Sequence, residues 1–487
     1  MATNADNPSF DLTIPTITHE FGAGFFATQL MSNVAQLMVA AFVLAAGSFG
    51  DLFGRKKWLL LGTIGLLVGY VLQSLALNVT MIIAARILVG FSTAVTTALT
   101  LAVVTQAFGA KEGAKAIGIF AGAGSFSAAA MPIISQYFNQ SFGWRFSFVV
   151  PLLLSGAGLL MAWKYLVESK DPNPRKLDKV GILLNAFGLT GIVYGFILMG
   201  SSGWGLNTKL WLLFGAIGIA AFIWWEKKTP DPALKLSLFK SPAFAIAVGV
   251  GLIMNLVDFG MHPILSMFLQ SVQGRTPLAA SFLLLPWALG AAVIAPFAGR
   301  WATRIPARKL MTIGFILSAI FSFATVLFTV DATALLIIGV LTPYALAYGL
   351  INIPRTALLM ASAPENESGA ASGANSMGIE TGTALGIAVF NTLVARNAIK
   401  NYSSLLKDAG ASAAQIDKAI EVVKSAVEGA VGTRFASLDS NLLSQLLDGF
   451  KESYTLAIGQ SFTIGALLLA ICAGVVWFGL RGKENQV

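Results

Sequence analysis

Three ionisable side chains lie inside stretches of this sequence that are apolar and long enough to cross a lipid bilayer: Asp258, Glu380 and Arg86. A charged group at the bilayer centre costs about 2.5–3.5 kcal/mol on insertion scales, so such residues are rare and usually functional. Carboxyl groups at this depth can bind protons or cations, and an arginine can pair with them. We therefore expect transport chemistry at these three positions.

Asp258 lies in the stretch Met254–His262. The spacing from Asn255 to Asp258 to His262 is three and then four residues, which puts all three side chains on one helix face. A polar face of this kind is stable when it lines a water-filled cavity, where the carboxyl and imidazole groups can exchange protons. The alternative interpretation is a structural, hydrogen-bonded aspartate, with the histidine merely near the outer surface.

Glu380 lies in Asn375–Gly386, a stretch rich in small residues. It is a candidate for binding protons or cationic substrates, and the alternative is a salt bridge to a neighbouring basic residue.

Arg86 needs acceptors for its guanidinium group, and Asp6 or Asp11, near the start of the sequence, are candidates. An Arg86–Asp6 pair that opens when the acid is protonated would couple proton binding to helix movement, and a purely structural pair is the alternative.

The composition identifies the kind of molecule that carries these groups. Only 11% of the 487 residues are charged and 56% are hydrophobic, whereas soluble domains contain about 25% charged residues. This composition indicates a polytopic membrane protein. The net charge of +9 comes from Lys and Arg in short loops between apolar runs, which determine topology rather than indicate nucleic acid. The single cysteine, Cys472, and two separated histidines, His19 and His262, give no disulfide framework or metal signature. No cleavable signal peptide, nucleotide loop or nucleophile–base set is evident, so we do not expect an enzyme.

A spanning helix needs about 20 apolar residues. Windows of this length predict 13 complete spans, at approximately 26–49, 58–77, 80–106, 116–138, 146–167, 180–200, 209–225, 243–270, 278–299, 310–330, 333–357, 371–395 and 458–479. Residues 1–18 are too polar for a full span and look like the second half of a first helix, which makes 14 spans in a complete chain. Either that helix is truncated or the start codon was placed too late, and we favour a late start. If the basic residues at 55–57 are cytoplasmic, the basic loops at 111–115, 175–179, 227–228, 304–309 and 481–483 fall on the cytoplasmic side as well. A long hydrophilic segment, 396–455, with helical patterning at 411–428, is then predicted to lie on the outer side of the membrane.

A short turn between the first two complete spans carries the most specific motif, Gly-Ser-Phe-Gly-Asp-Leu-Phe-Gly-Arg-Lys-Lys at residues 47–57. Its glycines allow a tight reversal, and its basic residues place it in the cytoplasm. The order of its residues resembles the loop 2–3 signature of the major facilitator superfamily, whose acidic and basic residues act as a latch between helix bundles. The resemblance assigns this gating role to Gly47, Gly50, Asp51, Gly54, Arg55 and Lys56.

An internal repeat supports the resemblance, because Ala46-Gly47 and the following basic cluster recur at Ala298-Gly299 through Lys309, with Thr303 in place of Asp51. The resemblance implies an all-α polytopic membrane protein with the major facilitator fold: two six-helix bundles with substrate held between them. Two extra spans at the join are similar to the 14-span drug:proton antiporter family. The expected parts are an N-terminal bundle (1–167), a linker with two spans (168–241) and a C-terminal bundle (242–487), whose external segment covers 396–457.

The resemblance also qualifies individual residues. Relatives usually have a neutral residue at the position of Glu380, and acids in this helix of multidrug members can bind cationic drugs or protons. The family's fifth-helix antiporter motif is Gly-x-x-x-Gly-Pro-x-x-Gly-Gly, and only its proline, Pro132, is present here. This loss weakens the assignment as an antiporter. Candidates for the apolar lining of a substrate cavity are Phe259, Met261, Met267, Trp287 and Tyr344, and the alternative, which is more common for aromatic and Met residues, is plain packing.

From these observations we expect an exporter of hydrophobic, cationic drugs or toxic compounds across the bacterial inner membrane, as a multi-pass protein. It would work in exchange for protons, need no cofactor or metal, bind no nucleic acid and act as a monomer. The alternatives are an exporter or uniporter of a specific metabolite or lipid and, in another class, a membrane sensor that transports nothing.

Overall fold

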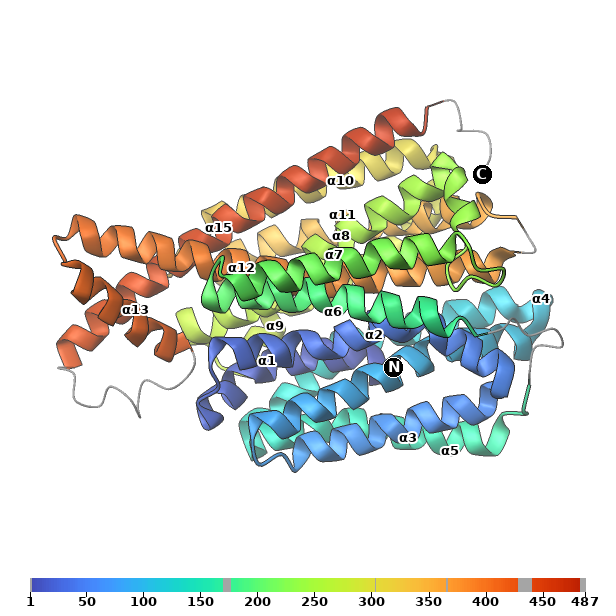
Figure 1. The fold of residues 1–487 in the computed structure, drawn as a ribbon, viewed down its shortest axis with the longest axis horizontal. Helices are drawn as coiled ribbons and strands as arrows, with labels where there is room; N and C mark the ends of the chain where they lie inside the picture. Colours follow the sequence, from blue (N-terminus) through green and yellow to red (C-terminus); the bar gives the residue numbers. More distant parts are fainter. Residues whose placement is uncertain (1, 170–176, 303, 365–366, 428–439, 482–487) are drawn as a thin grey trace.

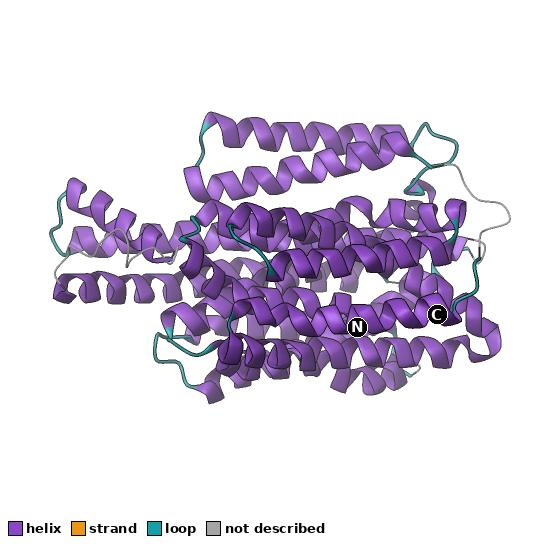
Figure 2. Cartoon of the chain, turned by 90° about the horizontal axis from the view of Figure 1, so that it is seen from below, coloured by secondary structure: helices purple, strands orange, loops and turns teal. Residues whose placement is uncertain are grey.

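The computed structural model describes residues 2–169, 177–302, 304–364, 367–427 and 440–481, and within these ranges the chain forms helices and no strands (Figures 1 and 2). Helices are the expected element in a membrane protein, because every backbone polar group is satisfied within its own segment. Most of them run along the long axis of the molecule (Figure 1). The predicted all-α class is confirmed.

The first half of the chain forms one group of helices, drawn in blue and cyan in the lower part of Figure 1. It consists of α1 (Ala2–Phe21), α2 (Phe25–Phe53), α3 (Arg55–Ser74), α4 (Val79–Phe142), the short η1 (Trp144–Phe148) and α5 (Val149–Tyr165). Within this group α4 contacts α1, α2 and α3, and α3 contacts α5.

The helix α4 replaces the two separate helices predicted at 80–106 and 116–138. Its start and its end both contact α1, because Arg86 pairs with Asp6 and Gln136 donates a hydrogen bond to the carbonyl oxygen of Ser9. Fifty residues of straight helix would separate Arg86 from Gln136 by about 75 Å, whereas Asp6 and Ser9 are less than one turn apart. The continuous helix must therefore bend back on itself, and its two arms lie where two spans were expected.

The two extra spans form a hairpin of α6 (Lys179–Ser202) and α7 (Leu206–Glu226), drawn in green across the middle of Figure 1. The helices approach closely where Gly191 faces Gly215, since a Cβ atom at Gly191 would lie 2.6 Å from the Cα atom of Gly215. Helix α6 also contacts α2 and α12, so the hairpin covers one side of the seam between the two halves of the chain.

The second half begins after a linker that contains η2 (Leu236–Lys240). It comprises α8 (Pro242–Met267), a π-helical turn η3 (Phe268–Val272), α9 (Pro277–Ala302), α10 (Ala307–Phe323), η4 (Ala324–Leu327), α11 (Ala334–Ala361), α12 (Ser368–Asp408), α13 (Ala413–Val427) and α15 (Ser440–Gly479). The principal contacts pair α8 with α12, α9 with α11, and α10 with α15. The halves meet where α2 contacts α12 and where α4 contacts α9.

Among the described residues, 12 helices are long and apolar enough to cross a membrane. They include both helices of the hairpin and six from the second half of the chain. Helix α1 and the second arm of α4 are not among these 12, so the predicted total of 14 spans is not confirmed and stays a prediction.

The hydrophilic segment predicted at 396–455 is not separate from the adjoining spans, which corrects the sequence interpretation. Helix α12 continues through it to Asp408, and α15 already begins at Ser440. Together with α13 they project beyond the other helices at one end of the molecule, on the left of Figures 1 and 2. Residues 428–439, which include the end of the helix predicted at 411–428, lie outside the described residues.

The close packing of α8 on α12 sets the positions of Asp258 and Glu380 in the two helices. A Cβ atom at Gly386 would overlap the carbonyl oxygen of Leu256, and one at Gly382 would overlap that of Leu252. We expect Gly386→Ala to lower the melting temperature of the purified protein, because the backbones must separate, although alanine is the better helix former by about 1 kcal/mol. Gly249→Ala on α8 is the matched control, since its Cβ has nothing within 4 Å; equal melting temperatures for both variants would contradict this packing.

Candidate functional site

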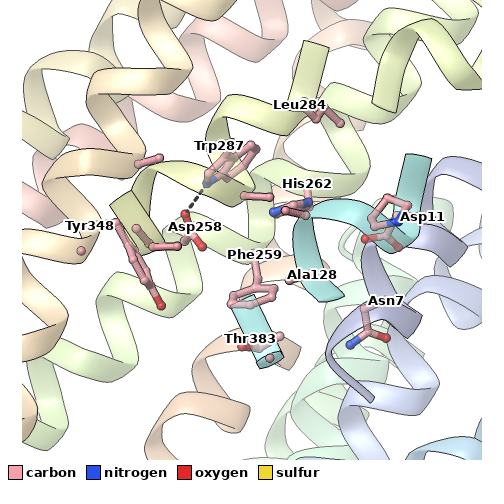
Figure 3. A pocket seen from close by; sticks show the side chains of 18 of the residues that line it. Asn7, Asp11, Ala128, Asp258, Phe259, His262, Leu284, Trp287, Tyr348 and Thr383 are labelled. Carbon is pink, nitrogen blue, oxygen red and sulfur yellow. Dashed lines mark hydrogen bonds between the residues drawn. The ribbon is translucent and has the colours of Figure 1, made fainter. Parts of the chain in front are cut away.

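A cavity of about 580 Å³ lies between the two halves of the chain (Figure 3). Side chains from α1, α2, α4, α8, α9, α11 and α12 line it. Its ionisable lining residues are Asp11, Asp258, His262, Tyr348 and Glu380. Among the described residues, no lysine or arginine lines the cavity. The result is a chamber with three carboxyl groups and no permanent positive charge.

Asp258 lies on α8 and is 6% exposed. The indole Nε1 of Trp287, on α9, donates a hydrogen bond of 3.0 Å to Asp258 Oδ1, which is the dashed line in Figure 3. The ring of His262 stacks on the same indole, with ring centroids 4.1 Å apart, and Phe259 stacks on the other side of His262 at 5.8 Å. The carboxyl group thus lies beside three aromatic rings, a surface suited to flat apolar molecules with a positive charge.

Glu380 and Asp11 enter the same cavity from α12 and α1. Within the described residues, neither carboxyl group has an ion pair with a basic side chain. An ionised carboxylate in a low-dielectric site is costly without a positive partner. Both acids are therefore available to a proton or to a cation that enters the cavity, and the alternative salt bridge to a neighbouring basic residue is not seen for Glu380.

Asn255 does not line the cavity but supports it. Its Nδ2 donates to the carbonyl oxygen of Gly251 at 2.8 Å, and its Oδ1 accepts from the hydroxyl of Tyr348 at 3.1 Å. Tyr348 lines the cavity. The predicted polar face of α8 therefore divides into Asp258 and His262, which face the cavity, and Asn255, which positions Tyr348.

Arg86 and Asp6 form an ion pair that is closed off from water, with exposures of 0% and 4%. The second guanidinium nitrogen donates to Asn7 Oδ1 at 2.9 Å, and the guanidinium carbon lies 4.0 Å from the ring centre of Phe10. Asn7 lines the cavity, whereas Arg86 and Asp6 do not. The pair predicted from sequence thus lies directly behind one residue of the cavity wall.

Sequence reasoning missed a second buried arginine, Arg355 on α11, which is 1% exposed. It donates to the carbonyl oxygen of Ala247 at 3.2 Å, to Asn375 Oδ1 at 2.8 Å and to Asn352 Oδ1 at 3.0 Å. Asn352 lines the cavity. The rule that singled out Arg86, a charge inside an apolar run, applies equally to Arg355 and could have found it.

The motif at 47–57 covers the end of α2, Gly54 and the start of α3, so the predicted turn is reduced to Gly54. Gly54 has a positive φ of 112° that favours glycine. Arg55 Nη2 lies 2.8 Å from Asp51 Oδ1, so this pair lies one helical turn apart within the motif. Lys56 Nζ donates to the carbonyl oxygens of Trp163 and Leu166 at the end of α5. These contacts join α3 to α5 within the first half of the chain, and the latch between bundles stays a prediction for Asp51, Arg55 and the glycines, Gly47 and Gly50 included.

Glu168, which follows α5, completes this junction and was not singled out from the sequence. Its two carboxylate oxygens accept from the backbone N–H groups of Lys56 at 3.0 Å and Lys57 at 3.1 Å. A carboxylate at this position satisfies unpaired donors at the start of α3 and complements the helix dipole.

The other expected lining residues divide by location. Pro132 lines the cavity on the second arm of α4, as do Phe259 and Trp287. Tyr344 lies behind the cavity, with its ring edge-on to Trp287 at 5.9 Å. Met261 and Met267 do not line the cavity but pack in the apolar core of the second half, which is the alternative given for them.

Hydrogen bonds between the halves lie next to the cavity. Ser266 Oγ donates to the carbonyl oxygen of Asp11 at 3.0 Å, and Gln270 Nε2 donates to that of Leu12 at 3.0 Å. Both join α1 to the end of α8 or to η3, the end that the loop charges assign to the outside. Two helix groups that close over a cavity with membrane-embedded acids define a membrane transporter rather than an enzyme.

The chain belongs to the Major Facilitator Superfamily, whose family model matches residues 3–387. This confirms the resemblance read from the motif at 47–57. Solved structures share the fold: a bacterial homologue of the lysosomal transporter Spinster matches with a TM-score of 0.63 at 16% identity, over 99% of this chain and 94% of that one. A proton-dependent oligopeptide transporter matches with a TM-score of 0.62 at 15% identity, over 98% and 96% of the two chains.

Characterised relatives include drug transporters. The chain is 28% identical to the multidrug resistance protein Stp of Mycobacterium tuberculosis over 79% of this chain and 72% of that protein. It is 26% identical to the multidrug efflux pump LfrA of Mycolicibacterium smegmatis over 98% and 93% of the two chains. It is also 26% identical to the methyl viologen resistance protein SmvA of Salmonella typhimurium, over 97% and 94%.

Proposed function

We propose that this protein exports lipophilic cations from the cytoplasm across the inner membrane in exchange for protons, and that it acts as a monomer. The observation that carries the proposal is the charge of the cavity, with three carboxyl groups and no lysine or arginine among its described lining residues. The names of the relatives, which include multidrug and methyl viologen resistance proteins, support the same substrate class.

Exchange follows from competition for the same carboxyl groups. A cationic drug that enters from the cytoplasm displaces the protons held by Asp258 and Glu380, because the ionised acids are then paired with the drug. When the halves rock and the cavity opens outward, protons from outside neutralise the acids and the cation loses its partners. No cofactor is needed in this cycle, since the proton gradient drives it.

The experiment that tests this proposal compares substrates of matched shape and different charge in inside-out membrane vesicles. We expect energised vesicles to accumulate ethidium or a quaternary ammonium compound, and a protonophore to abolish the accumulation. Anionic dyes of similar size should not accumulate. Transport of anionic or neutral compounds without transport of cations would instead indicate a carrier for a specific metabolite or lipid, and cation flux that persists without a gradient would indicate a uniporter.

A further inference from the structure

Two further buried carboxyl groups lie outside the cavity lining, in the hairpin of α6 and α7. Asp178 precedes α6 and is 9% exposed, and Glu226 ends α7 and is 3% exposed. Neither residue lines the cavity, and neither forms an ion pair with a described basic residue. Two acids withdrawn from water at one end of a helical hairpin require an explanation of their own, because buried charges are normally paired.

One oxygen of each carboxyl group accepts hydrogen bonds from the protein. Asp178 Oδ1 accepts from the backbone N–H of Gly181 at 2.8 Å and from the indole Nε1 of Trp225 at 2.8 Å. Glu226 Oε2 accepts from the backbone N–H of Leu234 at 3.0 Å. These bonds fix both carboxyl groups in place, and the second one attaches the linker after α7 to the end of the hairpin.

The other two oxygens, Asp178 Oδ2 and Glu226 Oε1, are buried and have no hydrogen-bond donor. A Cβ atom at Gly181 would overlap both of these oxygens, so both border the same small space. The absence of a side chain at Gly181 therefore makes the room in which the two oxygens face each other. Two facing carboxylates cannot both be ionised without strong repulsion, whereas one proton between them turns the contact into a short, charge-assisted hydrogen bond.

Among the residues that the structure describes, no charged group near the pair replaces that proton. On the same helices, Lys179, Lys227 and Lys228 are exposed, and Lys228 lies over the ring of Trp224. In the linker, Lys235 is already paired with Glu367, which precedes α12, at 2.8 Å. The remaining ionisable residues of the linker are Lys240, which is exposed, and Asp231, which adds negative charge rather than removing it.

We propose that Asp178 and Glu226 form a proton-binding site, in which the two carboxyl groups share one proton and hold the linker to the hairpin. Whichever carboxyl group carries the proton donates it to the facing oxygen of the other, so the pair keeps a net charge of −1. The site lies at the end of the hairpin that the loop charges assign to the cytoplasm. Loss of the shared proton at high internal pH would set two carboxylates against each other and loosen the linker that leads to α8 and, through Lys235, to α12.

The test uses Asp178→Asn and Glu226→Gln in the purified full-length protein. In either variant the new amide can donate where the shared proton was, so the contact no longer depends on pH. We expect the melting temperature of the wild type to fall as pH rises from about 5 to about 9, because the folded pair holds one proton more than two free carboxylates. Each variant should lose part of that fall, on the order of 2 °C. The infrared carbonyl band of protonated carboxylic acids should also be weaker in each variant.

The matched control is Asp231→Asn, which removes one acid from the same linker but not from the pair. It should keep the pH dependence and the infrared band of the wild type. The proposal is overturned if Asp178→Asn and Glu226→Gln both retain the wild-type slope and band, because both carboxyl groups are then ionised in the folded protein. If Asp178→Asn does not fold, since Asp178 also caps α6, Glu226→Gln alone decides between these outcomes.

Discussion

Ethidium should bind the purified wild-type protein more tightly as pH is raised, and Glu380→Gln should remove part of this pH dependence. The reason is that protons and the cation compete for the same carboxyl groups, so each proton displaced per cation gives about a tenfold change in affinity per pH unit while that acid titrates. At high pH the variant should bind at least about tenfold more weakly, since it lacks one negative charge in a low-dielectric cavity. Fluorescence titration at several pH values measures both effects.

Asp258→Asn should act in the same direction, and the structure allows it without loss of packing. The amide oxygen of Asn can still accept the hydrogen bond from Trp287 that Asp258 Oδ1 accepts now. The matched control is Glu452→Gln on α15, an exposed acid outside the cavity. Equal affinity and equal pH dependence in the wild type and both cavity variants would show that these acids do not bind the cation.

Arg86→Ala should be among the most destabilising single substitutions in this chain. It leaves the carboxyl group of Asp6 buried at 4% exposure without its partner, and breaking a buried pair by removing one member costs about 3–5 kcal/mol. A large decrease in the yield of folded protein and in its melting temperature is the expected result. Arg275→Ala is the control, because Arg275 is only half-buried and its side chain donates a hydrogen bond to the nearby Gln273 rather than to a buried acid.

The double variant Arg86→Gln, Asp6→Asn separates a structural role from a coupling role. Two neutral partners can keep a hydrogen bond, so much of the lost stability should return. If the pair only holds α1 against α4, the stable double variant should transport at close to the wild-type rate. If the pair alternates between ionised and protonated forms during the cycle, the double variant should be folded and inactive. A double variant as unstable as Arg86→Ala would contradict the account of the pair as an isolated partnership.

The candidate site could be predicted from sequence to the extent that membrane burial makes charges conspicuous. Asp258, Glu380 and Arg86 stand out in apolar runs. Asp6 and Asp11 were both candidate partners for Arg86, and the structure shows the pair with Asp6. What the sequence could not supply is which of these side chains meet. Asp11 and Glu380 line the same cavity although they are 369 residues apart, and only the packing of the two halves brings them together.

Hydropathy located the apolar stretches but not where each helix begins and ends. It locates where an apolar run ends, but a helix continues for as long as its residues favour helix and find partners. This is why α4 runs through the polar stretch between two predicted spans, and why α12 extends to Asp408 beyond the apolar part. The Asp178–Glu226 pair could not be predicted from the sequence for a further reason, because it depends on how the residue before α6 packs against the end of α7.

The most direct test of proton-coupled export is proton movement in acid-loaded proteoliposomes on addition of ethidium or a quaternary ammonium compound. The account predicts that the cation releases lumenal protons through the wild-type protein, and that the Asp258→Asn, Glu380→Gln double variant, although folded, releases none. No proton release by the wild type with any cation of a broad panel, in protein that is correctly folded, would contradict drug:proton antiport.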